Sequence, residues 1–243
     1  MIKIEGLSKH YGNKVGLKKL DLTIKSGEIF AFLGPNGAGK TTTIKMMVGL
    51  LRPTTGTITI CDKDIIKETI AAKKYLAYVP DQPYLYDKLT GREFLEFVAL
   101  MYKIPLQVAT EKIEKLTALF SSYEYVDRLT ENYSHGMKQR IVFSAALIHD
   151  PQVLVVDEPM VGLDPKSAAI VKNVFKDQAA KGTTVFVSTH SLDVAEQIAD
   201  RIAIIKHGEI IALGTLEELR KRVQKEARLE DIFLELTEEE QPN

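Results

Sequence analysis

Hydrophobic and polar residues alternate near the start of the chain, a pattern typical of strands with one exposed face. Residues 2–4 and 20–24 alternate in this way, and a turn over 53–56 precedes another alternating run at 57–60. Alternation with a period of two sends successive side chains to opposite faces of a sheet. We therefore expect residues 1–60 to form short strands joined by turns.

Other runs are almost entirely apolar, which indicates strands that are buried on both faces. They span residues 29–33, 153–156 and 184–187. Such runs are typical of parallel sheets, because both faces of those sheets are covered. A helical stretch at 168–180 separates the second run from the third. The order strand, helix, strand predicts an α/β fold.

Residues 90–149 carry the spacing of amphipathic helices instead. Apolar residues recur there at helical intervals in two sets: 94, 97, 98 and 101, then 113, 116 and 120. Thr90 and Glu93 have the spacing of a capping box at a helix start. We expect residues 87–149 to form a mostly helical subdomain, inserted into an α/β core made of 1–86 and 150–215.

The last part of the chain is expected to form a hairpin over 202–213 and then helices. Thr215 and Glu218 form a second candidate capping box, which opens a helix with apolar residues at 216, 219 and 223. A final apolar stripe follows at 229, 232, 233 and 236. Residues 216–243 are thus predicted to be a helical tail with a frayed acidic end at 238–243. We expect the whole chain, 1–243, to form a single domain.

Composition and charge limit the classes of function. The chain has 45% apolar and 27% charged residues, as folded soluble proteins do, and its net charge of −1 gives no overall attraction to nucleic acid. Cys61 is the only cysteine, which excludes an internal disulfide and a multi-cysteine metal site. No run approaches the roughly 18 apolar residues of a membrane span, and the start lacks a signal-peptide core. We therefore expect a soluble chain that reaches a membrane only through a partner.

The most specific motif follows the run at 29–33 and precedes an expected helix at 42–50. It fits G-x-x-x-x-G-K-[ST], the pattern of a phosphate-binding loop, with the residues Gly34, Pro35, Asn36, Gly37, Ala38, Gly39, Lys40 and Thr41. Backbone N–H groups of such a loop, and the positive end of the helix, bind phosphate. Lys40 is expected to reach the β- and γ-phosphates and Thr41 to hold Mg²⁺, with Thr42 also in the ATP site. A chance glycine turn is the alternative, which the flanking strand and helix disfavour.

Two carboxylates follow the apolar run at 153–156. Asp157 and Glu158 come at a strand end, where ligands collect in open parallel sheets. Beside a phosphate loop, Asp157 is expected to hold Mg²⁺ and Glu158 to align or deprotonate an attacking water. One aspartate suffices, because Mg²⁺ also takes phosphate oxygens and waters as ligands. The alternative is that Asp157 and Glu158 are simply two surface acids at the end of a strand, since any strand can end in this way.

Residues 133–147 add an element that ordinary phosphate-loop kinases and GTPases lack. A helical stretch is preceded by a run that resembles the Leu-Ser-Gly-Gly-Gln signature of ATP-binding cassette (ABC) ATPases: Tyr133-Ser134-His135-Gly136-Met137-Lys138-Gln139-Arg140. The resemblance to that family spans about residues 2–215. It implies that Ser134, His135 and Gly136 complete the ATP site of the other subunit in a head-to-tail dimer. His135 and Met137 depart from the family pattern, and Ser134 also suits a plain helix N-cap.

The resemblance assigns roles to three further positions. Tyr11 matches the aromatic residue that stacks on adenine, and His190 matches the switch histidine that contacts the γ-phosphate. Asp164, within residues 161–165, matches the aspartate of the loop that links the subunits. The plainer alternatives are packing for Tyr11, a structural role for His190, and for Asp164 an N-cap before a proline at the first helical position.

The position of the family's glutamine loop is open. The family places Gln directly after a stretch like 78–80, whereas this chain has Asp81 there and Gln82 one residue later. Either residue is a candidate to reach Mg²⁺ or water, with Asp81 favoured. Residues 84–86 follow and suit a partner interface, because Tyr joins a large contact area to a hydrogen-bonding tip. Packing against the helical subdomain is the alternative for them.

The resemblance as a whole implies the ATP-hydrolysing subunit of an ABC transporter, with ATP and Mg²⁺ as cofactors and Glu158 and His190 as catalytic residues. It implies a phosphate-loop NTPase (RecA-like) core with an N-terminal antiparallel β subdomain and an inserted α-helical subdomain. It implies as partners a membrane permease and a second copy or a similar chain, on the cytoplasmic face of the cell membrane. No nucleic-acid partner is expected.

The signature and the closing run at 229–236 resemble ATPases of exporter-type (ABC-2-like) permeases, so we expect outward transport. One alternative is a soluble ABC ATPase that acts on ribosomes or DNA. The short spacing between Lys40 and Ser134 disfavours its DNA-repair form, which inserts a long coiled coil there. The other alternative is a low-turnover regulatory module gated by ATP.

Overall fold

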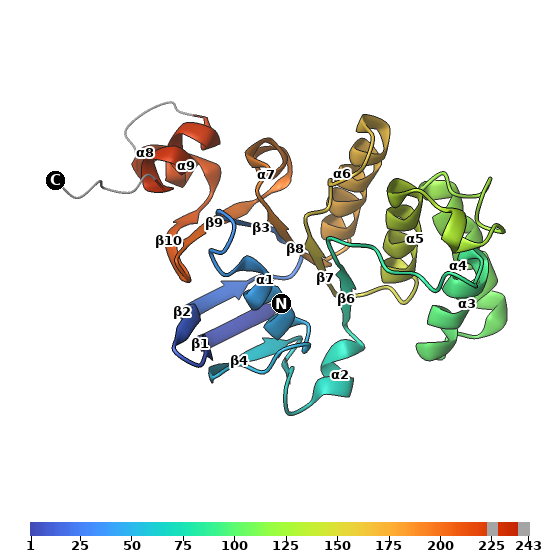
Figure 1. Ribbon diagram of the computed structural model, residues 1–243, viewed down its shortest axis with the longest axis horizontal. Coiled ribbons are helices and arrows are strands. Elements are labelled where there is room, and N and C mark those ends of the chain that lie inside the picture. Colours follow the sequence, from blue (N-terminus) through green and yellow to red (C-terminus); the bar gives the residue numbers. More distant parts are fainter. Residues whose placement is uncertain (223–227, 238–243) are drawn as a thin grey trace.

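The computed structural model describes residues 1–222 and 228–237, whose strands form two sheets (Figure 1). The N-terminal sheet is antiparallel and consists of β1 (Ile2–Tyr11), β2 (Lys14–Ile24), β4 (Thr55–Ile60) and β5 (Lys63–Asp64). Its strand order is β2-β1-β4-β5. Ile2 pairs with Ile24 on one side and with Ile60 on the other, and all these side chains are buried. The alternating runs of the sequence therefore formed strands as predicted.

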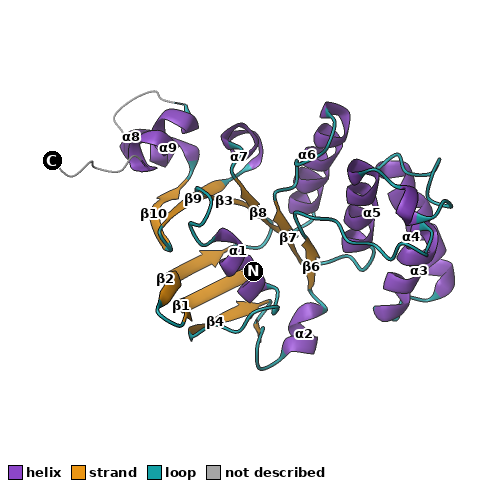
Figure 2. Ribbon diagram, in the orientation of Figure 1, coloured by secondary structure: helices purple, strands orange, loops and turns teal. Residues whose placement is uncertain are grey.

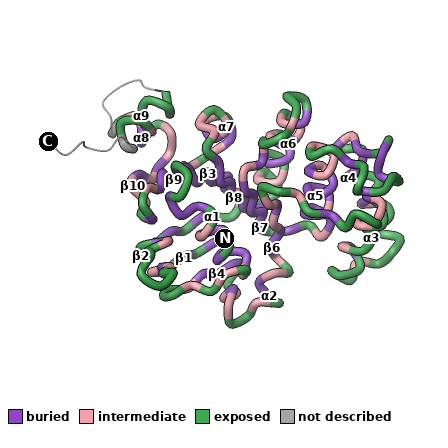
Figure 3. Tube along the Cα trace, viewed as in Figure 1, coloured by how far each residue is buried: buried purple, intermediate pink, exposed green. Residues whose placement is uncertain are grey.

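The core sheet contains the apolar runs. Its strands are β3 (Ile29–Leu33), β6 (Leu76–Val79), β7 (Val153–Asp157), β8 (Thr184–Thr189), β9 (Arg201–Lys206) and β10 (Glu209–Gly214). The order is β10-β9-β3-β8-β7-β6, parallel except for β10, which forms the predicted hairpin with β9. Every residue of β3, β7 and β8 is buried (Figure 3). The predicted parallel sheet and α/β class are confirmed.

Strand β7 shows why the runs are apolar throughout. Val153 and Val155 share a buried cluster with α1 (Lys40–Met47), which lies between the two sheets (Figure 2). Leu154 and Val156 share another cluster with α6 (Pro165–Ala180) on the opposite face. A polar side chain at any of these positions would lose its water without gaining a partner, which costs on the order of 1–3 kcal/mol.

Helices α3 (Gly91–Met101), α4 (Leu106–Leu119) and α5 (His135–Leu147) lie together beyond the β6 edge of the core sheet (Figure 1). A short 3₁₀ turn at Thr130–Asn132 precedes α5. The predicted capping box starts α3: Thr90 Oγ1 accepts from the Glu93 N–H at 3.1 Å, and Glu93 Oε2 accepts from the Thr90 N–H at 2.7 Å. The inserted helical group of the predicted architecture is confirmed.

The predicted apolar stripe of α3 is wrong in part. Phe97 and Met101 are 42% and 67% exposed, whereas Leu95 and Ala99 are buried. Helix α3 is apolar on most of its circumference, so periodicity alone could not choose the buried side. The packing partners of α3 decide which of its sides is buried. The Gly91 N–H donates to Tyr133 Oη at 3.2 Å, and this contact turns the side that carries Leu95 and Ala99 toward α5. In α4, by contrast, the predicted Ile113 and the following Phe120 are buried as expected.

Two helices begin earlier in the chain than predicted. Helix α1 begins at Lys40, earlier than the expected 42–50, and ends at Met47 before Gly49 with φ +69°. Helix α6 begins at Pro165 rather than 168, because Asp164 caps it. Shorter helices, α2 (Thr69–Lys73) and α7 (Leu192–Ile198), complete the connections between strands.

The chain continues into α8 (Leu216–Arg222) and α9 (Leu229–Thr237). The predicted box at the start of α8 is confirmed, with Thr215 Oγ1 accepting from the Glu218 N–H at 3.2 Å and Glu218 Oε2 accepting from the Thr215 N–H at 2.8 Å. Leu229 and Ile232 are fully buried. Val223 and the tail 238–243 lie outside the described residues. None of the helices in the described ranges is both long and apolar enough to cross a membrane.

Candidate nucleotide-binding site

The phosphate-loop motif lies between β3 and α1, as the sequence predicts. Gly39 is the N-cap of α1 and has φ +111°, a conformation that side chains rarely adopt. A Cβ on Gly34 would lie 2.4 Å from the Ile205 carbonyl oxygen of the neighbouring β9. Glycine is therefore required at both positions, and the loop can bring its backbone N–H groups to the first turn of α1.

Lys40 is held inside this loop. Its Nζ donates to the Gly34 carbonyl at 2.6 Å and to the Pro35 carbonyl at 3.1 Å, and the residue is only 8% exposed. Burial lowers the pKa of Lys40, while the nearby Glu158 and Asp157 act in the opposite direction. A buried ammonium group against a glycine-rich loop fits the anionic phosphates of ATP.

Asp157 ends β7 at the same edge of the sheet and is 4% exposed. Burial raises the pKa of Asp157 to about 6, and the negative charges of Asp81 and Glu158 act in the same direction. Its neighbour across the strands is Ser188, whose buried hydroxyl opposes the effect of burial and lowers the pKa of Asp157. A buried carboxylate without a salt bridge to any described residue fits a hard cation such as Mg²⁺. Thr41 lies in the first turn of α1, where its hydroxyl is exposed.

Glu158 and His190, predicted as the catalytic pair, are brought together. Glu158 Oε1 lies 2.9 Å from His190 Nδ1, and Glu158 Oε2 accepts from Thr189 Oγ1 at 3.2 Å. The backbone at Glu158 has φ +48°, and its N–H donates to the Ser188 carbonyl at 2.8 Å. Strain of this kind gathers at functional sites, because surrounding contacts must hold it. The carboxylate is thus fixed at the carboxyl ends of β7 and β8.

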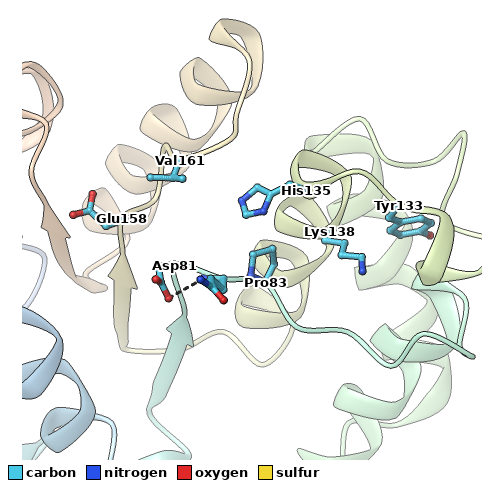
Figure 4. A pocket seen from close by; sticks show the side chains of 8 residues that line it. Asp81, Pro83, Tyr133, His135, Lys138, Glu158 and Val161 are labelled. Atoms are coloured by element: carbon cyan, nitrogen blue, oxygen red, sulfur yellow. Dashed lines mark hydrogen bonds between the residues drawn. The ribbon is translucent and has the colours of Figure 1, made fainter.

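The signature residues stand at the start of α5. Ser134 is its N-cap and its Oγ accepts from the Met137 N–H at 3.3 Å, so the plain N-cap role is confirmed. Ser134 and His135 are exposed. A cavity of about 550 Å³ joins this helix start to the end of β7 (Figure 4); its lining residues are Asp81, Gln82, Pro83, Tyr133, His135, Lys138, Glu158 and Val161.

Asp81 and Gln82 both line that cavity, so the structure leaves the choice between them open. Asp81 Oδ1 accepts from the Gln82 N–H at 2.8 Å, and both side chains are exposed. In Figure 4 the Asp81 carboxylate lies on the side of the cavity nearer Glu158. The negative charge of Asp81 also raises the pKa of Asp157, so Asp81 lies within electrostatic range of the expected metal position.

Asp164 caps α6, as its plainer interpretation predicts. Its Oδ1 accepts from the Ser167 N–H at 2.9 Å, and Arg140 of α5 donates to Oδ2 at 3.0 Å. These hydrogen bonds from Ser167, more than the charge of Arg140, lower the pKa of Asp164 to about 2. Its expected role between subunits stays a prediction.

Tyr11 lies at the end of β1 and does not line the cavity that holds the signature residues. Its side chain is packed against Gly16, where a Cβ would lie 2.6 Å from the ring, and Gly16 in turn contacts Gly39 of the phosphate loop. Tyr11 is 47% exposed, with Lys9 Nζ 5.3 Å from the ring centroid. Packing and a place beside the phosphate loop are therefore both observed, and stacking on adenine stays a prediction.

Sequence reasoning missed the polar ends of β8. Thr189 holds the Glu158 carboxylate, and Ser188 lies opposite Asp157. The available signal was position: both residues end an apolar strand at the edge where Asp157 and Glu158 end another. Arg140, which joins α5 to Asp164, had no such signal because that contact is long-range.

A family model described as ABC transporter matches residues 17–161. The chain belongs to the ABC transporter family. The linearmycin resistance ATP-binding protein LnrL of Bacillus subtilis is 39% identical over 92% of this chain and 72% of its own length. An ABC transporter ATP-binding protein of Nostoc sp. is 40% identical over 84% of this chain, which spans 61% of that longer relative.

Solved structures agree with this family. The ATP-binding subunit of an ABC transporter superposes with a TM-score of 0.93 at 31% identity, covering 98% of this chain and 100% of the other. A dimeric ATP-binding cassette in a post-hydrolysis state, bound to ADP and Pi, gives a TM-score of 0.79 at 25% identity, covering 89% and 99%. The chain is thus an ABC transporter ATP-binding protein with the ABC ATPase fold predicted from its sequence.

Asp157→Asn is expected to raise the free energy of unfolding of this ABC protein at pH 7. Because burial raises the pKa of Asp157 from 3.8 to about 6, the folded chain holds a proton at pH values where the unfolded chain has released it. Ionisation therefore destabilises the fold as the pH rises through this window. We expect a gain of about 1–3 kcal/mol at pH 7 that shrinks toward zero near pH 4.

Urea unfolding at pH 4, 5 and 7 measures this effect. Asp177→Asn, which removes an exposed carboxylate from α6, is the matched control and should change little at any pH. A loss of stability at pH 7 in Asp157→Asn, or a gain that persists at pH 4, would contradict the cost assigned to this buried charge.

Proposed function

We propose that the chain hydrolyses ATP and drives a transporter whose membrane part is a separate permease. The observation that carries the proposal is the convergence of Lys40, Asp157 and the Glu158–His190 pair at one edge of the core sheet. A cation, a metal-binding carboxylate and an oriented base are the groups that phosphoryl transfer needs. The pairing of Glu158 with His190 and Thr189 favours turnover over a purely regulatory role.

The chemistry follows from these positions. Lys40 and the loop N–H groups bind the β- and γ-phosphates, and the N-terminus of α1 adds its positive dipole end. Thr41 and Asp157 would hold Mg²⁺, which neutralises charge that develops on the phosphates. Glu158 orients the attacking water and accepts its proton. His190 keeps Glu158 in place through Nδ1, and its other ring nitrogen is the candidate donor to the γ-phosphate.

The ATP site is proposed to be completed by a second copy or a similar chain. Ser134 and His135 are exposed at the N-terminus of α5, where a helix can bind an anion. The similar cassette bound to ADP and Pi is dimeric. In this proposal ATP binding closes the dimer, and hydrolysis followed by product release opens it.

Glu158→Gln is expected to bind ATP with little change and to lose ATP turnover by at least about 100-fold, because the amide cannot accept the proton of the attacking water. Phosphate release measures turnover, and size-exclusion chromatography with Mg²⁺ and ATP measures dimer formation, which should increase in the variant. Glu196→Gln, which breaks an ion pair with Arg220 on the far side of α7, is the control. Turnover in Glu158→Gln within threefold of the wild type would refute the assignment.

The proposed permease contact is a surface around Tyr102, which we call the Tyr102 face. Three adjoining hollows share Tyr102 in their lining. The large apolar side chains that line them are strongly exposed: Leu50 at 63%, Ile70 at 80%, Tyr84 at 76% and Met101 at 67%. Scattered apolar residues are normal on a surface, but a group around one groove marks an interaction site. The predicted partner role of residues 84–86 is consistent with this position.

The charged residues of the Tyr102 face indicate what kind of permease segment fits it. The largest of the three hollows, about 720 Å³, is also lined by Lys73, Lys74 and Lys103, which form no salt bridge with any described residue. The Tyr102 ring stacks on His149 at 3.7 Å between centroids. Burial lowers the pKa of His149 to about 4, so this aromatic pair is neutral. The fitting partner is therefore an amphipathic permease segment with apolar side chains and at least one carboxylate.

Met101→Asp is expected to abolish co-purification with the permease while ATP binding stays intact, because the exposed side chain contributes little to folding but the aspartate places a charge in the apolar contact. Leu234→Asp replaces a leucine of α9 that is 49% exposed and serves as the control. Equal recovery of the permease with both variants would exclude the Tyr102 face as the contact.

Outward transport and a place on the cytoplasmic side of the membrane complete the proposal. The support for export is the likeness of the signature and the 229–236 run to exporter-type ATPases, together with the antibiotic-resistance name of LnrL. The cargo would be chosen by the permease.

A further inference from the structure

His135, which stands where the family signature has a glycine, is seated on another glycine. A Cβ built on Gly162 would lie 2.3 Å from His135 Cδ2 and 2.9 Å from Nε2. Gly162 has φ +73°, so a side chain there would also be strained. In Figure 4 the His135 ring extends from the start of α5 into the cavity, on the side of the loop that carries Val161. The ring therefore occupies the space that any other residue at 162 would need.

Two further contacts join the same elements. A Cβ on Gly136 would lie 3.3 Å from the Gly162 carbonyl oxygen, and Arg140 donates to Asp164 at 3.0 Å. Met137 on α5 and Leu163 in the loop pack against the same buried cluster. The first two turns of α5 and the loop 159–164 thus meet along a continuous contact.

This loop is short and begins at the proposed catalytic residue. Glu158 is anchored to β8 by its backbone N–H and its carboxylate, and Asp164 at the other end caps α6. With both ends fixed, the position of the middle of the loop depends on what it rests against. His135 is the side chain that fills the gap between that middle and α5.

We propose that His135 is a positioning residue: its ring, seated on Gly162, holds the loop 159–164 against α5 and so sets how the Ser134 helix start lies relative to Glu158. The inference rests on the proposed role of Glu158 for its effect on turnover, but the contact itself does not. It explains how the chain accommodates a bulky residue in the signature. It also predicts that the volume of the ring matters, and not its charge.

The test is a double-mutant cycle in the full-length chain. Gly162→Ala and His135→Gly should each lower kcat for ATP about 5–10-fold. Gly162→Ala, which changes neither the phosphate loop nor the signature, should also leave KM within twofold. The double variant should lose no more than the worse single variant, since both changes break one contact. His135→Phe, which keeps a ring of similar size, should lose clearly less kcat than His135→Gly does.

Gly182→Ala is the matched control for backbone strain. Gly182 has φ +94°, but a Cβ there would meet nothing within 4 Å. It should therefore report the cost of a left-handed alanine alone and keep kcat near the wild-type value. Losses that multiply in the double variant, or a Gly162→Ala variant that behaves like Gly182→Ala, would overturn the proposal.

Hydrogen–deuterium exchange gives a readout independent of turnover. Amides of the loop 159–164 should exchange at least threefold faster in both single variants and at the wild-type rate in His135→Phe. If the wild type shows no ATPase activity that depends on Glu158, the proposed function fails. The exchange measurement still tests the contact between His135 and Gly162 in that case. Unchanged exchange in both single variants would overturn the positioning role even in an active enzyme.

Discussion

The burial of two opposite charges that form no salt bridge with each other constrains this whole site. Lys40 and Asp157 are both less than one-tenth exposed at the same sheet edge, and each is kept from water by the fold. Burial lowers the pKa of Lys40 and raises the pKa of Asp157, so both groups are destabilised in their charged forms. A folded protein keeps such a pair where a ligand supplies the missing counter-charges. Phosphate for Lys40 and a divalent cation for Asp157 would do so, and binding would then stabilise the fold by mass action.

The core sheet can keep these two charges buried because its strands are packed on both faces. In β7, alternate residues enter the α1 side and the α6 side, so the strand cannot shift without disturbing two cores. Strand β8, its neighbour, is buried along its whole length. The ends of these strands carry Asp157, Glu158 and Thr189 at fixed spacing. Rigid strands with polar residues only at their ends place functional groups more accurately than loops do.

Local patterns predicted the parts of this molecule that depend on local physics. The fully apolar runs gave β3, β7 and β8, and the spacing of Thr90 with Glu93 gave a helix start, because each depends on neighbours in sequence. The buried side of α3 was mispredicted, since apolar residues cover most of that helix and only its packing partners choose between them. The seat of His135 on Gly162 was also beyond prediction, because nothing in either segment specifies a contact across the fold.

The two ends of α5 connect the proposed functions of the molecule. Ser134 caps its start beside the cavity that Glu158 lines, and His149, two residues beyond its end, stacks on Tyr102 at the Tyr102 face. Thirteen helical residues separate these points by about 20 Å. Between them Phe143 is fully buried and stacks with Phe120, which directly follows α4, so α5 is packed as part of the helical group. A displacement imposed by a partner at the Tyr102 face would therefore reach the signature as a rigid-body motion, without any change inside the helix. The hinge for that motion must then lie where the helical group joins the core, and residues 80–90 form one such connection between β6 and α3. Asp81 and Gln82 lie in that connection and line the cavity with Glu158, so the same movement that shifts α5 also changes the surroundings of the Glu158 carboxylate.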